Sequence, residues 1–473
     1  MSDTALDTRQ KALLVNLDPR LYGTFAEIGA GQEVVRWFFR VGGAAGTVAK
    51  SMSAYDMTVS DAIYGTSDRY VSRSRLEAML AHEFELNVQR LDSKRGDHTC
   101  FFAFADTVAA RSFRGGSECH GWMGITFQHA PRAPESRILI HVRMLDVENA
   151  AQAEALGMVG VNLVYGAGFL HQDPESLLLS LLDQLSVGRI EIDMIEFSGA
   201  AFSKVDNRLM SLKLVQLGLS GAAMFGPHGE VLQPSEVFYR KAILVERGAF
   251  HPVTKVHMDM LKSASEKFRA LPEVKNANTP VIEVMEITMR NLLSDQTAVD
   301  PQDFLDRADV LAACGLPVLV SDFSEYYRLS AFLSRMTHEP IGIALGVTRL
   351  LNLFDESFYA NLPGGLLESF GRLLKHQLKL FVYPALDKDS ATIRTVENLV
   401  VPAGLQKLYE YLNERGSFVG LDAADPSLLS IYPKDVLSAM LRRDPTWKTM
   451  VPPEVVETIE QKKLFMHDSE PKA

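Results

Sequence analysis

Cysteine is scarce in this sequence. Its three cysteines, Cys100, Cys119 and Cys314, are far apart, and none belongs to a C-x-x-C pair. Neither a disulfide framework nor a cysteine zinc site is therefore expected. Positive charge is also low, since 59 acidic residues outnumber 48 lysines and arginines. The resulting net charge of −11 excludes nucleic acid as the main partner, because phosphate binding needs a basic surface.

Long hydrophobic runs are missing as well. The longest uncharged stretch, residues 155–172, contains glycines, amides and a histidine. This composition predicts a strand at 159–165 with its turns, and not a membrane span. The N-terminal residues include acids and lack the apolar core of a signal peptide. We therefore predict a cytoplasmic protein that does not bind a membrane.

Several signatures of catalysis are absent. No G-x-S-x-G nucleophile elbow occurs, and the histidines form neither H-E-x-x-H nor H-x-x-x-H. Residues 81–84 resemble a metalloprotease helix only superficially. The sequence therefore predicts no metal site, and it names no cofactor.

Short apolar runs alternate with segments of helical periodicity along most of the chain. This alternation predicts an α/β fold of mostly parallel sheets with flanking helices. Further strands are expected at 99–108, 136–145, 189–197, 241–248, 280–287, 316–322, 340–347 and 378–384. Helices are expected at 74–91, 174–185, 205–218, 301–315 and 365–376. In residues 99–145, successive strands with no helix between them predict an antiparallel insertion.

Composition also predicts how the chain divides. The polar stretch 269–280 ends in Asn-Thr-Pro and is typical of a linker. After residue 400 the strand-like runs disappear and helical segments remain. We therefore predict an N-terminal α/β domain at 1–268, a second α/β domain at 269–400 and a small helical C-terminal tail at 401–473.

A weak internal βα repeat links three segments. Each begins with a strand that ends in a glutamate, which is Glu27, Glu196 or Glu286, and continues through a helix to a second strand. Any chain of alternating strands and helices can generate such a coincidence. The functional interpretation is that acidic strand ends gather at one carboxyl edge, where open parallel sheets bind ligands.

The first repeat contains the stretch Glu-Ile-Gly-Ala-Gly-Gln-Glu, residues 27–33. Gly29 and Gly31 would let the backbone approach an anion at the start of the next helix. The third glycine of a dinucleotide fingerprint is replaced by Val34, and Glu33 would repel a phosphate there. A tight corner in the sheet is the alternative interpretation.

Polar donors cluster after the strand of the second repeat. Lys204 and Arg208 are four residues apart and share one helix face, with Asn207 beside them. These three residues are candidates for holding an anionic ligand. A solvated helix start, capped by Ser203 or Asp206, is the alternative.

The third repeat leads to Ser-Asp-Phe-Ser-Glu-Tyr-Tyr-Arg, residues 321–328. Asp322, Glu325 and Tyr326 are residue types that catalyse reactions, although a capped helix with surface charges explains them equally. For catalysis we expect Glu196 or Asp322 to be the general base, because burial at a strand end raises the pKa of a carboxylate. Glu325 and Tyr326 complete the candidate catalytic set.

The segments 205–225, 243–254, 321–335 and 378–384 resemble a bacterial cytosolic family. The resemblance extends over nearly the whole chain. Members of this family are labelled nicotinate-nucleotide adenylyltransferase or TonB-dependent receptor. The receptor label implies a barrel of alternating strands, which the helices predicted here contradict. The adenylyltransferase label implies nucleotidyl transfer; Gly23, Thr24 and Phe25 match the start of that motif, but its His-x-Gly-His is absent.

Our leading hypothesis is a cytosolic α/β protein that binds a nucleotide or another small anionic metabolite at the carboxyl ends of its strands. Glu27, Gly29 and Gly31 would line this cleft together with the residues of the other two repeats. One alternative is a non-enzymatic protein that assembles into homo-oligomers. A second alternative is nucleotidyl transfer, which only the family label implies.

Overall fold

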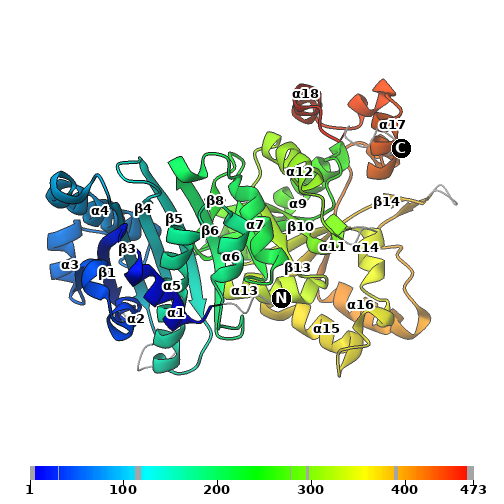
Figure 1. Cartoon of the computed structure of the whole chain (residues 1–473). Coiled ribbons are helices and arrows are strands. Elements are labelled where there is room, and N and C mark those ends of the chain that lie inside the picture. The colour runs from blue at the N-terminus through cyan, green and yellow to red at the C-terminus, as the bar shows by residue number, and fades with distance from the viewer. Residues whose placement is uncertain are drawn as a thin grey trace. The chain divides into compact units, whose positions relative to one another are not determined.

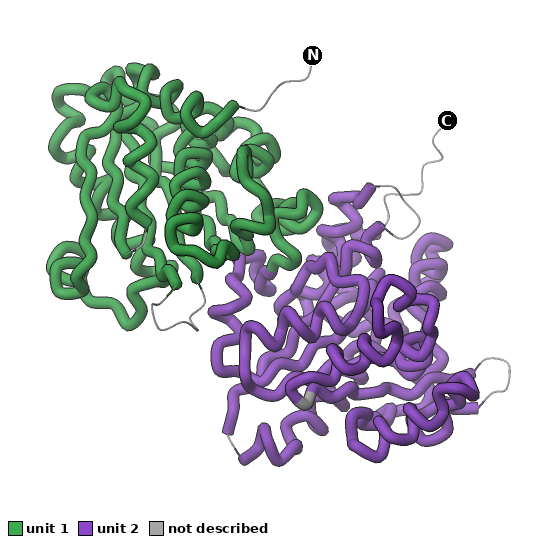
Figure 2. Tube along the Cα trace, turned by 90° about the horizontal axis from the view of Figure 1, so that it is seen from below, with its two compact units in different colours: residues 1–223 green, residues 224–473 purple. Residues whose placement is uncertain are grey.

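The computed structural model describes residues 6–29, 31–111, 119–276, 278–293, 298–387 and 392–465. Within these ranges the chain forms two compact units, unit 1 at residues 1–223 and unit 2 at 224–473 (Figures 1 and 2). Each unit is an α/β structure built on its own sheet, which confirms the predicted fold class. No described helix has the length and apolar character that crossing a membrane requires.

Unit 1 contains a six-stranded sheet in the order β2-β1-β3-β4-β5-β6. β2, β1 and β3 are parallel, whereas β4, β5 and β6 each run antiparallel to the strand before them. The antiparallel insertion predicted from residues 99–145 is therefore confirmed. The strands are β1 (Leu21–Gly29), β2 (Val48–Ser53), β3 (Cys100–Ala109), β4 (His120–Gln128), β5 (Glu135–Met144) and β6 (Ile190–Gly199).

Helices cover both faces of this sheet. Gly124 of β4 faces Leu80 of one helix, whereas Glu27 of β1 points to the start of another, on the opposite face. The helices are α1 (Thr8–Leu17), α2 (Val34–Val41), α3 (Met57–Tyr64), α4 (Arg73–Arg95), α5 (Asn149–Phe169), α6 (Pro174–Ser180) and α7 (Asn207–Gln216). Thus α4 lies on one face, and α2 with α5 on the other.

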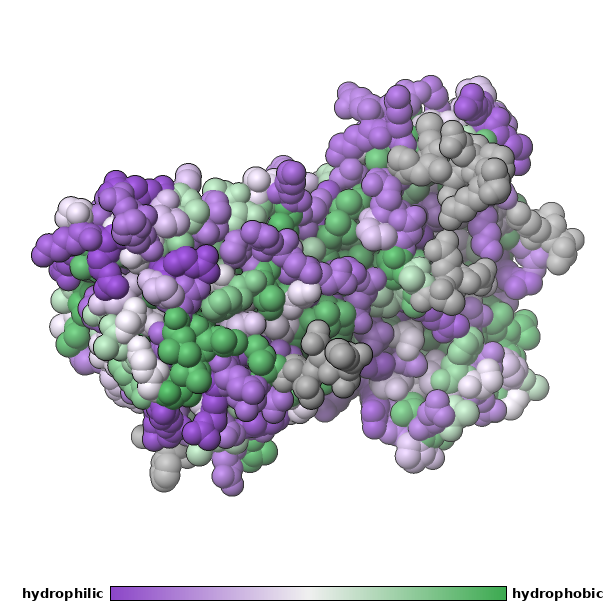
Figure 3. All heavy atoms as spheres, in the orientation of Figure 1, coloured by the Kyte–Doolittle hydropathy of each residue, from purple (hydrophilic) through white to green (hydrophobic). Residues whose placement is uncertain are grey.

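A buried lysine holds α1 on the face of the sheet that α2 and α5 cover. Lys11 donates hydrogen bonds to Asn162 Oδ1 of α5 at 3.0 Å and to Asp183 Oδ2 at 2.6 Å. Hydrophobic residues nevertheless gather on the visible surface over α1 and α5 (Figure 3). The exposed leucines of α1 are Leu13, Leu14 and Leu17. α1 is therefore held by its polar contacts as well as by its apolar ones.

The strand predicted at 159–165 is wrong, because this segment lies in the middle of α5. Most of the surface of α5 is apolar, and neighbouring helices and strands bury it. Its glycines allow the close approach: a Cβ at Gly160 would lie 2.3 Å from Val34 of α2. Such a helix has no polar face, so its sequence resembles that of a buried strand.

Unit 2 contains an eight-stranded sheet in the order β16-β13-β12-β9-β10-β11-β7-β8. All neighbours from β16 to β10 and the pair β10–β11 are parallel. The strands are β7 (Ala222–Phe225), β8 (Val231–Leu232), β9 (Ala242–Arg247), β10 (Val281–Thr288), β11 (Val318–Ser321), β12 (Ile341–Gly346), β13 (Lys379–Tyr383) and β16 (Phe418–Gly420). A separate hairpin is formed by β14 (Ala385–Leu386) and β15 (Ile393–Arg394).

The six parallel strands of unit 2 follow the doubly wound order. Numbered along the chain from β9, they lie as 3-2-1-4-5-6, and the chain reverses direction across the sheet between β9 and β12. In open α/β sheets, ligands bind at the carboxyl ends of the strands beside such a reversal. The carboxyl ends of β9 and β12 therefore form the natural place for a site in unit 2.

The helices of unit 2 connect these strands and continue to the C-terminus. They are α8 (Pro234–Val237), α9 (Lys255–Arg269), α10 (Pro272–Lys275), α11 (Met289–Leu293), α12 (Pro301–Ala313), α13 (Tyr326–Met336), α14 (Val347–Asn352), α15 (Gly365–Leu373), α16 (Gln406–Glu414), α17 (Pro433–Leu441) and α18 (Pro453–Lys462). The predicted helical C-terminal tail is present, and β16 adds to it a short strand that the sequence pattern did not reveal.

The compact units differ from the three domains expected from the sequence. β9 precedes the predicted boundary at 268 and β10 follows it, yet the two strands are hydrogen-bonded neighbours. β16, beyond the predicted boundary at 400, pairs with β13 of the same sheet. Both boundaries thus fall inside one structural unit, because pairing between strands joins segments that polar connections separate in the sequence.

Candidate functional site

Two buried carboxylates stand side by side at the carboxyl edge of unit 1. Glu27 of β1 and Asp106 of β3 are partners in the parallel register, and both side chains are buried. The Glu27 carboxylate accepts hydrogen bonds from the backbone amides of Val34 at 2.8 Å and Val35 at 3.4 Å, at the start of α2. Neither carboxylate oxygen of Asp106 has a hydrogen-bond partner among the described residues.

Burial governs the protonation of this pair. It raises the pKa of Glu27 to about 7, and the amides of α2 oppose this rise. Burial, and then the charge of Glu27, raise the pKa of Asp106 well above its ordinary value. Two carboxylates this close cannot both be charged cheaply, so the pair holds at least one proton near neutral pH.

Both glycines of this edge lie where a side chain would clash with β3. Gly29 has a φ of +76°, and a Cβ there would lie 2.3 Å from the carbonyl oxygen of Val108. A Cβ at Gly31 would lie 2.1 Å from Asp106 Oδ1. The two glycines therefore permit close packing against β3, Gly29 at Val108 and Gly31 at Asp106. This is the tight-corner interpretation, and it explains both glycines without a phosphate.

The residues predicted from the second repeat do not join Glu27 and its glycines. Three strands separate β6 from β1, and the register places Glu196 on the face of the sheet opposite to Glu27. Glu196 forms an ion pair with Arg73 of α4 at 2.7 Å. The single cleft expected from the three repeats is therefore not formed within unit 1.

The predicted anion-binding residues of α7 have structural contacts. Asn207 bonds the backbone N–H and the carbonyl oxygen of Phe197 through its side chain, and Arg208 pairs with Asp206 at 2.7 Å. Lys204 is exposed on the connection from β6. These contacts match the alternative of a capped helix start, since Asp206 accepts the hydrogen bond of the Arg208 amide.

The carboxyl edge of unit 2 does bring several predicted residues together. Glu286 of β10 is fully buried and binds the Arg247 guanidinium of β9 through both oxygens, at 2.7 and 2.9 Å. Ser321 at the end of β11 donates a third hydrogen bond to Glu286 at 2.5 Å. Arg247 also donates to the Ser324 carbonyl oxygen at 3.1 Å. One arginine thus links the ends of three neighbouring strands.

Tyr326 lies directly against this arginine. Its ring centre is 4.4 Å from the Arg247 guanidinium carbon. Burial raises the pKa of Tyr326, while the charges of Arg247 and Arg349 oppose that rise. Glu325 lies next to Tyr326, and its buried Oε2 forms a long ion pair with Arg328 at 3.8 Å. Asp322 is exposed, so the burial expected to make it a general base is absent.

Glu246 of β9 is a second buried acid of this sheet and points to the face opposite to Glu286. Neither of its carboxylate oxygens has a hydrogen-bond partner in the described part of the chain, and burial raises its pKa well above the ordinary value. Burial raises the pKa of Tyr383, and its hydrogen bond to Asp259, the charge of Asp259 and the charge of Glu246 add to this rise. Successive residues of a strand point to opposite faces, so Glu246 and Arg247 do not line the same cleft.

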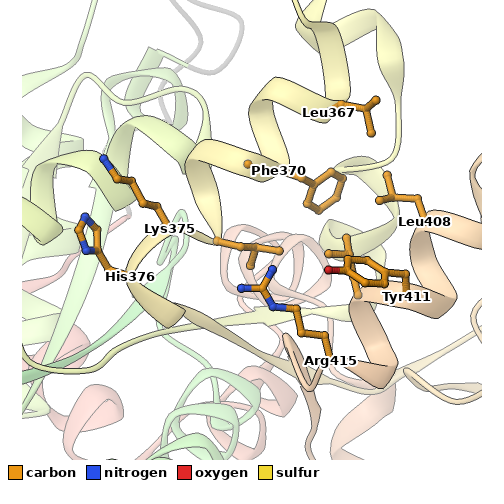
Figure 4. Close-up of a pocket in the computed structure, with 10 residues that line it drawn as sticks. Leu367, Phe370, Lys375, His376, Leu408, Tyr411 and Arg415 are labelled. Carbon is orange, nitrogen blue, oxygen red and sulfur yellow. The ribbon is translucent and has the colours of Figure 1, made fainter.

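A separate hollow lies between α15 and α16 in unit 2 (Figure 4). Apolar side chains, Tyr411 and His376 line it, and Lys375 and Arg415 supply positive charge. Both helices precede the amino ends of β13 and β16, so this hollow is at the opposite edge from Glu286. It shares no lining residue with the Arg247 cluster.

Sequence reasoning missed Asp106, Ser321 and the role of Arg247. Asp106 interrupts an apolar run in β3, which is a usable signal, because an acid inside a buried strand needs a proton or a partner. The contacts of Ser321 and Arg247 depend on which strands become neighbours.

Asp106→Asn tests the carboxylate pair. The raised pKa of each acid means that the native state binds more protons than the unfolded state between about pH 4.5 and 7, so stability falls as pH rises through this window. Asp106→Asn removes one charge, and we expect its melting temperature to fall about half as much between pH 5 and 8. Calorimetry at both pH values measures this. Asp97→Asn, at an exposed position, is the charge-matched control and should behave as the wild type. Equal losses in the wild type and Asp106→Asn would refute the pair.

Arg247→Met tests the buried ion pair of unit 2. The substitution leaves Glu286 buried without its cation, and we expect a loss of about 3–5 kcal/mol in the free energy of unfolding in urea. The double variant Arg247→Met/Glu286→Gln should recover part of this loss. Arg269→Met breaks a half-exposed pair with Glu283 and should cost less than about 1 kcal/mol. A cost for Arg247→Met as small as this control would contradict the assignment.

Comparisons with known proteins do not show a family. No family model and no curated protein matches the chain. Among solved structures, competence/damage inducible protein CihA from Agrobacterium tumefaciens is similar at 15% identity and a TM-score of 0.26, covering 35% of this chain and 99% of that chain. A competence-damaged protein (CinA) superfamily protein from Enterobacter cloacae is similar at 14% identity and a TM-score of 0.24, covering 35% of this chain and 92% of that chain. Likenesses this weak carry no functional argument.

Proposed function

We propose that unit 2 binds a mononucleotide or another phosphorylated metabolite at the carboxyl ends of β9, β10, β11 and β12. The observation that carries this proposal is the doubly wound strand order together with the Arg247–Glu286 pair at its carboxyl edge. Ligands of such sheets bind beside the point where the strand order reverses. Arg247 ends β9, one of the two strands that flank this point.

Arg349 is the residue best suited to hold an anionic group. It lies on α14, which begins where β12 ends, and its charge acts on Tyr326. Its side chain is exposed and has no ion pair with any described residue. Glu286 and Ser324 hold the Arg247 guanidinium in place, so part of its N–H groups remains for a ligand. Two arginines and a tyrosine hydroxyl are donors suited to a phosphate.

The turn after β9 limits the classes of ligand that can bind at this edge. The residues after β9 are Gly-Ala-Phe-His-Pro-Val-Thr, 248–254, with a single glycine. A dinucleotide fingerprint needs three glycines there to accommodate the pyrophosphate. A mononucleotide, a pyridine mononucleotide or a sugar phosphate fits this turn better than a dinucleotide does. Asp322, Glu325 and Tyr326 are members of the predicted catalytic set that lie at this edge, and Asp322 is exposed.

A binding panel tests the proposal. AMP, ATP, nicotinamide mononucleotide and ribose 5-phosphate are added at millimolar concentration in a thermal-shift assay, and hits are measured by calorimetry. We expect at least one to raise the melting temperature, because a ligand that binds only the native state stabilises it. Arg349→Met should weaken that ligand about tenfold or more, as expected for the loss of a charge-assisted hydrogen bond.

Two further variants locate the site. Arg442→Met removes an equally exposed arginine and should leave the affinity unchanged. Arg415→Met removes a charge from the hollow between α15 and α16. Loss of binding in Arg415→Met but not in Arg349→Met would move the site to that hollow and refute our placement. Absence of any shift across the panel would refute the function.

A further inference from the structure

Two histidines and an aspartate form a hydrogen-bonded chain across three strands of unit 1. His141 Nδ1 of β5 lies 2.6 Å from Asp193 Oδ1 of β6. His141 Nε2 lies 3.0 Å from Nδ1 of His120 at the start of β4. His141 and Asp193 are buried, whereas His120 is partly exposed at the edge of the sheet. The chain therefore runs from the interior to the surface.

The hydrogen bonds limit where the protons can lie. An ionised aspartate only accepts, so His141 Nδ1–H donates to Asp193. In the tautomer in which His141 Nε2 accepts, the Nδ1–H of His120 donates to it. This arrangement leaves Nε2 of His120 unprotonated and directed away from the chain. That atom has no hydrogen-bond partner among the described residues.

Neighbouring groups keep this imidazole neutral. Burial and then His141 lower the pKa of His120 to about 4, and the charges of Arg69 and Arg143 act in the same direction. Asp193 opposes them. Arg143 stands opposite His120 in the register and pairs with Glu191 of β6. The positive charges also favour an anionic group beside the ring.

We propose that Asp193, His141 and His120 form a general-base site, in which Nε2 of His120 takes a proton from a water or hydroxyl group next to an anionic or carbonyl group of a ligand. When Nε2 takes this proton, the Nδ1 proton of His120 passes to Nε2 of His141. The resulting imidazolium of His141 is held by the Asp193 carboxylate. This site uses none of the residues proposed to bind the metabolite in unit 2.

A purely structural role explains the chain less well. Trp122 packs against His141 with its ring centre at 5.0 Å, and the Arg143–Glu191 ion pair lies on the same face of the sheet. Apolar residues of similar size stabilise such a position at least as well as a buried charge does.

Diethyl pyrocarbonate, which acylates neutral imidazole nitrogen, measures the state of His120. An ordinary histidine with a pKa near 6.5 should react about tenfold more slowly at pH 5.5 than at pH 7.5. His120 should react at nearly equal rates at both pH values, because its pKa is about 4. Mass spectrometry of the full-length protein after digestion quantifies each histidine. His120→Gln removes the signal, and exposed His338 is the internal reference.

Asp193→Asn tests the relay itself. An asparagine amide that donates to His141 Nδ1 reverses the chain and places a proton on Nε2 of His120. We expect acylation of His120 to slow at least fivefold, with His338 unchanged. If this variant does not fold, long-range ¹H–¹⁵N spectra of histidine-labelled wild-type protein report the same property. They should show an unprotonated Nε2 on His120 and a protonated Nδ1 on His141.

Three outcomes would overturn the proposal. The first is no acylation of His120, which would mean that its Nε2 does not reach solvent. The second is a pH profile for His120 that matches that of His338. The third is a folded Asp193→Asn variant with the wild-type rate, or a spectrum with protonated Nε2 on His120. None of these outcomes tests the metabolite site proposed in unit 2.

Discussion

In both units, acidic side chains at the ends of parallel strands are buried. Each buried carboxyl group therefore needs either a bound proton or a cation in contact with it. Glu27 and Asp106 meet this need with protons, because their neighbours supply backbone amides but no positive side chain. Glu286 meets it with Arg247 and with the hydroxyl of Ser321. The carboxyl edge of the sheet in unit 1 therefore differs chemically from that in unit 2. Protons bound near neutral pH make the first edge sensitive to pH, whereas the second edge keeps a fixed ion pair whose remaining donors face the strand ends.

Strand direction decides which of these groups can act together. In unit 2 the neighbouring strands β9, β10 and β11 are parallel, so Arg247, Glu286 and Ser321 meet. In unit 1 the direction alternates from β3 onward, and Glu196 lies with Arg73 and away from Glu27. The same alternation aligns His120, His141 and Asp193 across β4, β5 and β6. The members of this polar chain come from alternating ends of successive strands, because these neighbours are antiparallel.

Much of the architecture follows from local patterns. The alternation of apolar runs with helical periodicity is enough to predict most strands to within a few residues, from β3 to β13, and the long helix α4. It fails for α5, whose buried surface has no polar face, and for β16, which is too short to show a period. The first and third repeats are true βαβ units, since β1 pairs with β2 and β10 with β11 in parallel. The middle repeat is not, because β6 and β7 belong to different sheets.

The sequence by itself determined the α/β class, the acidic surface charge and the positions of acids near strand ends. These properties depend on composition and on the identity of residues a few positions apart. Only the tertiary structure decided that Asp106 stands beside Glu27, that Arg247 neutralises Glu286 and that Asp193 reaches His120 through His141. Each of these contacts joins residues far apart in the chain. Their formation depends on strand order and direction, which hydrogen bonding between strands establishes and which no local pattern encodes.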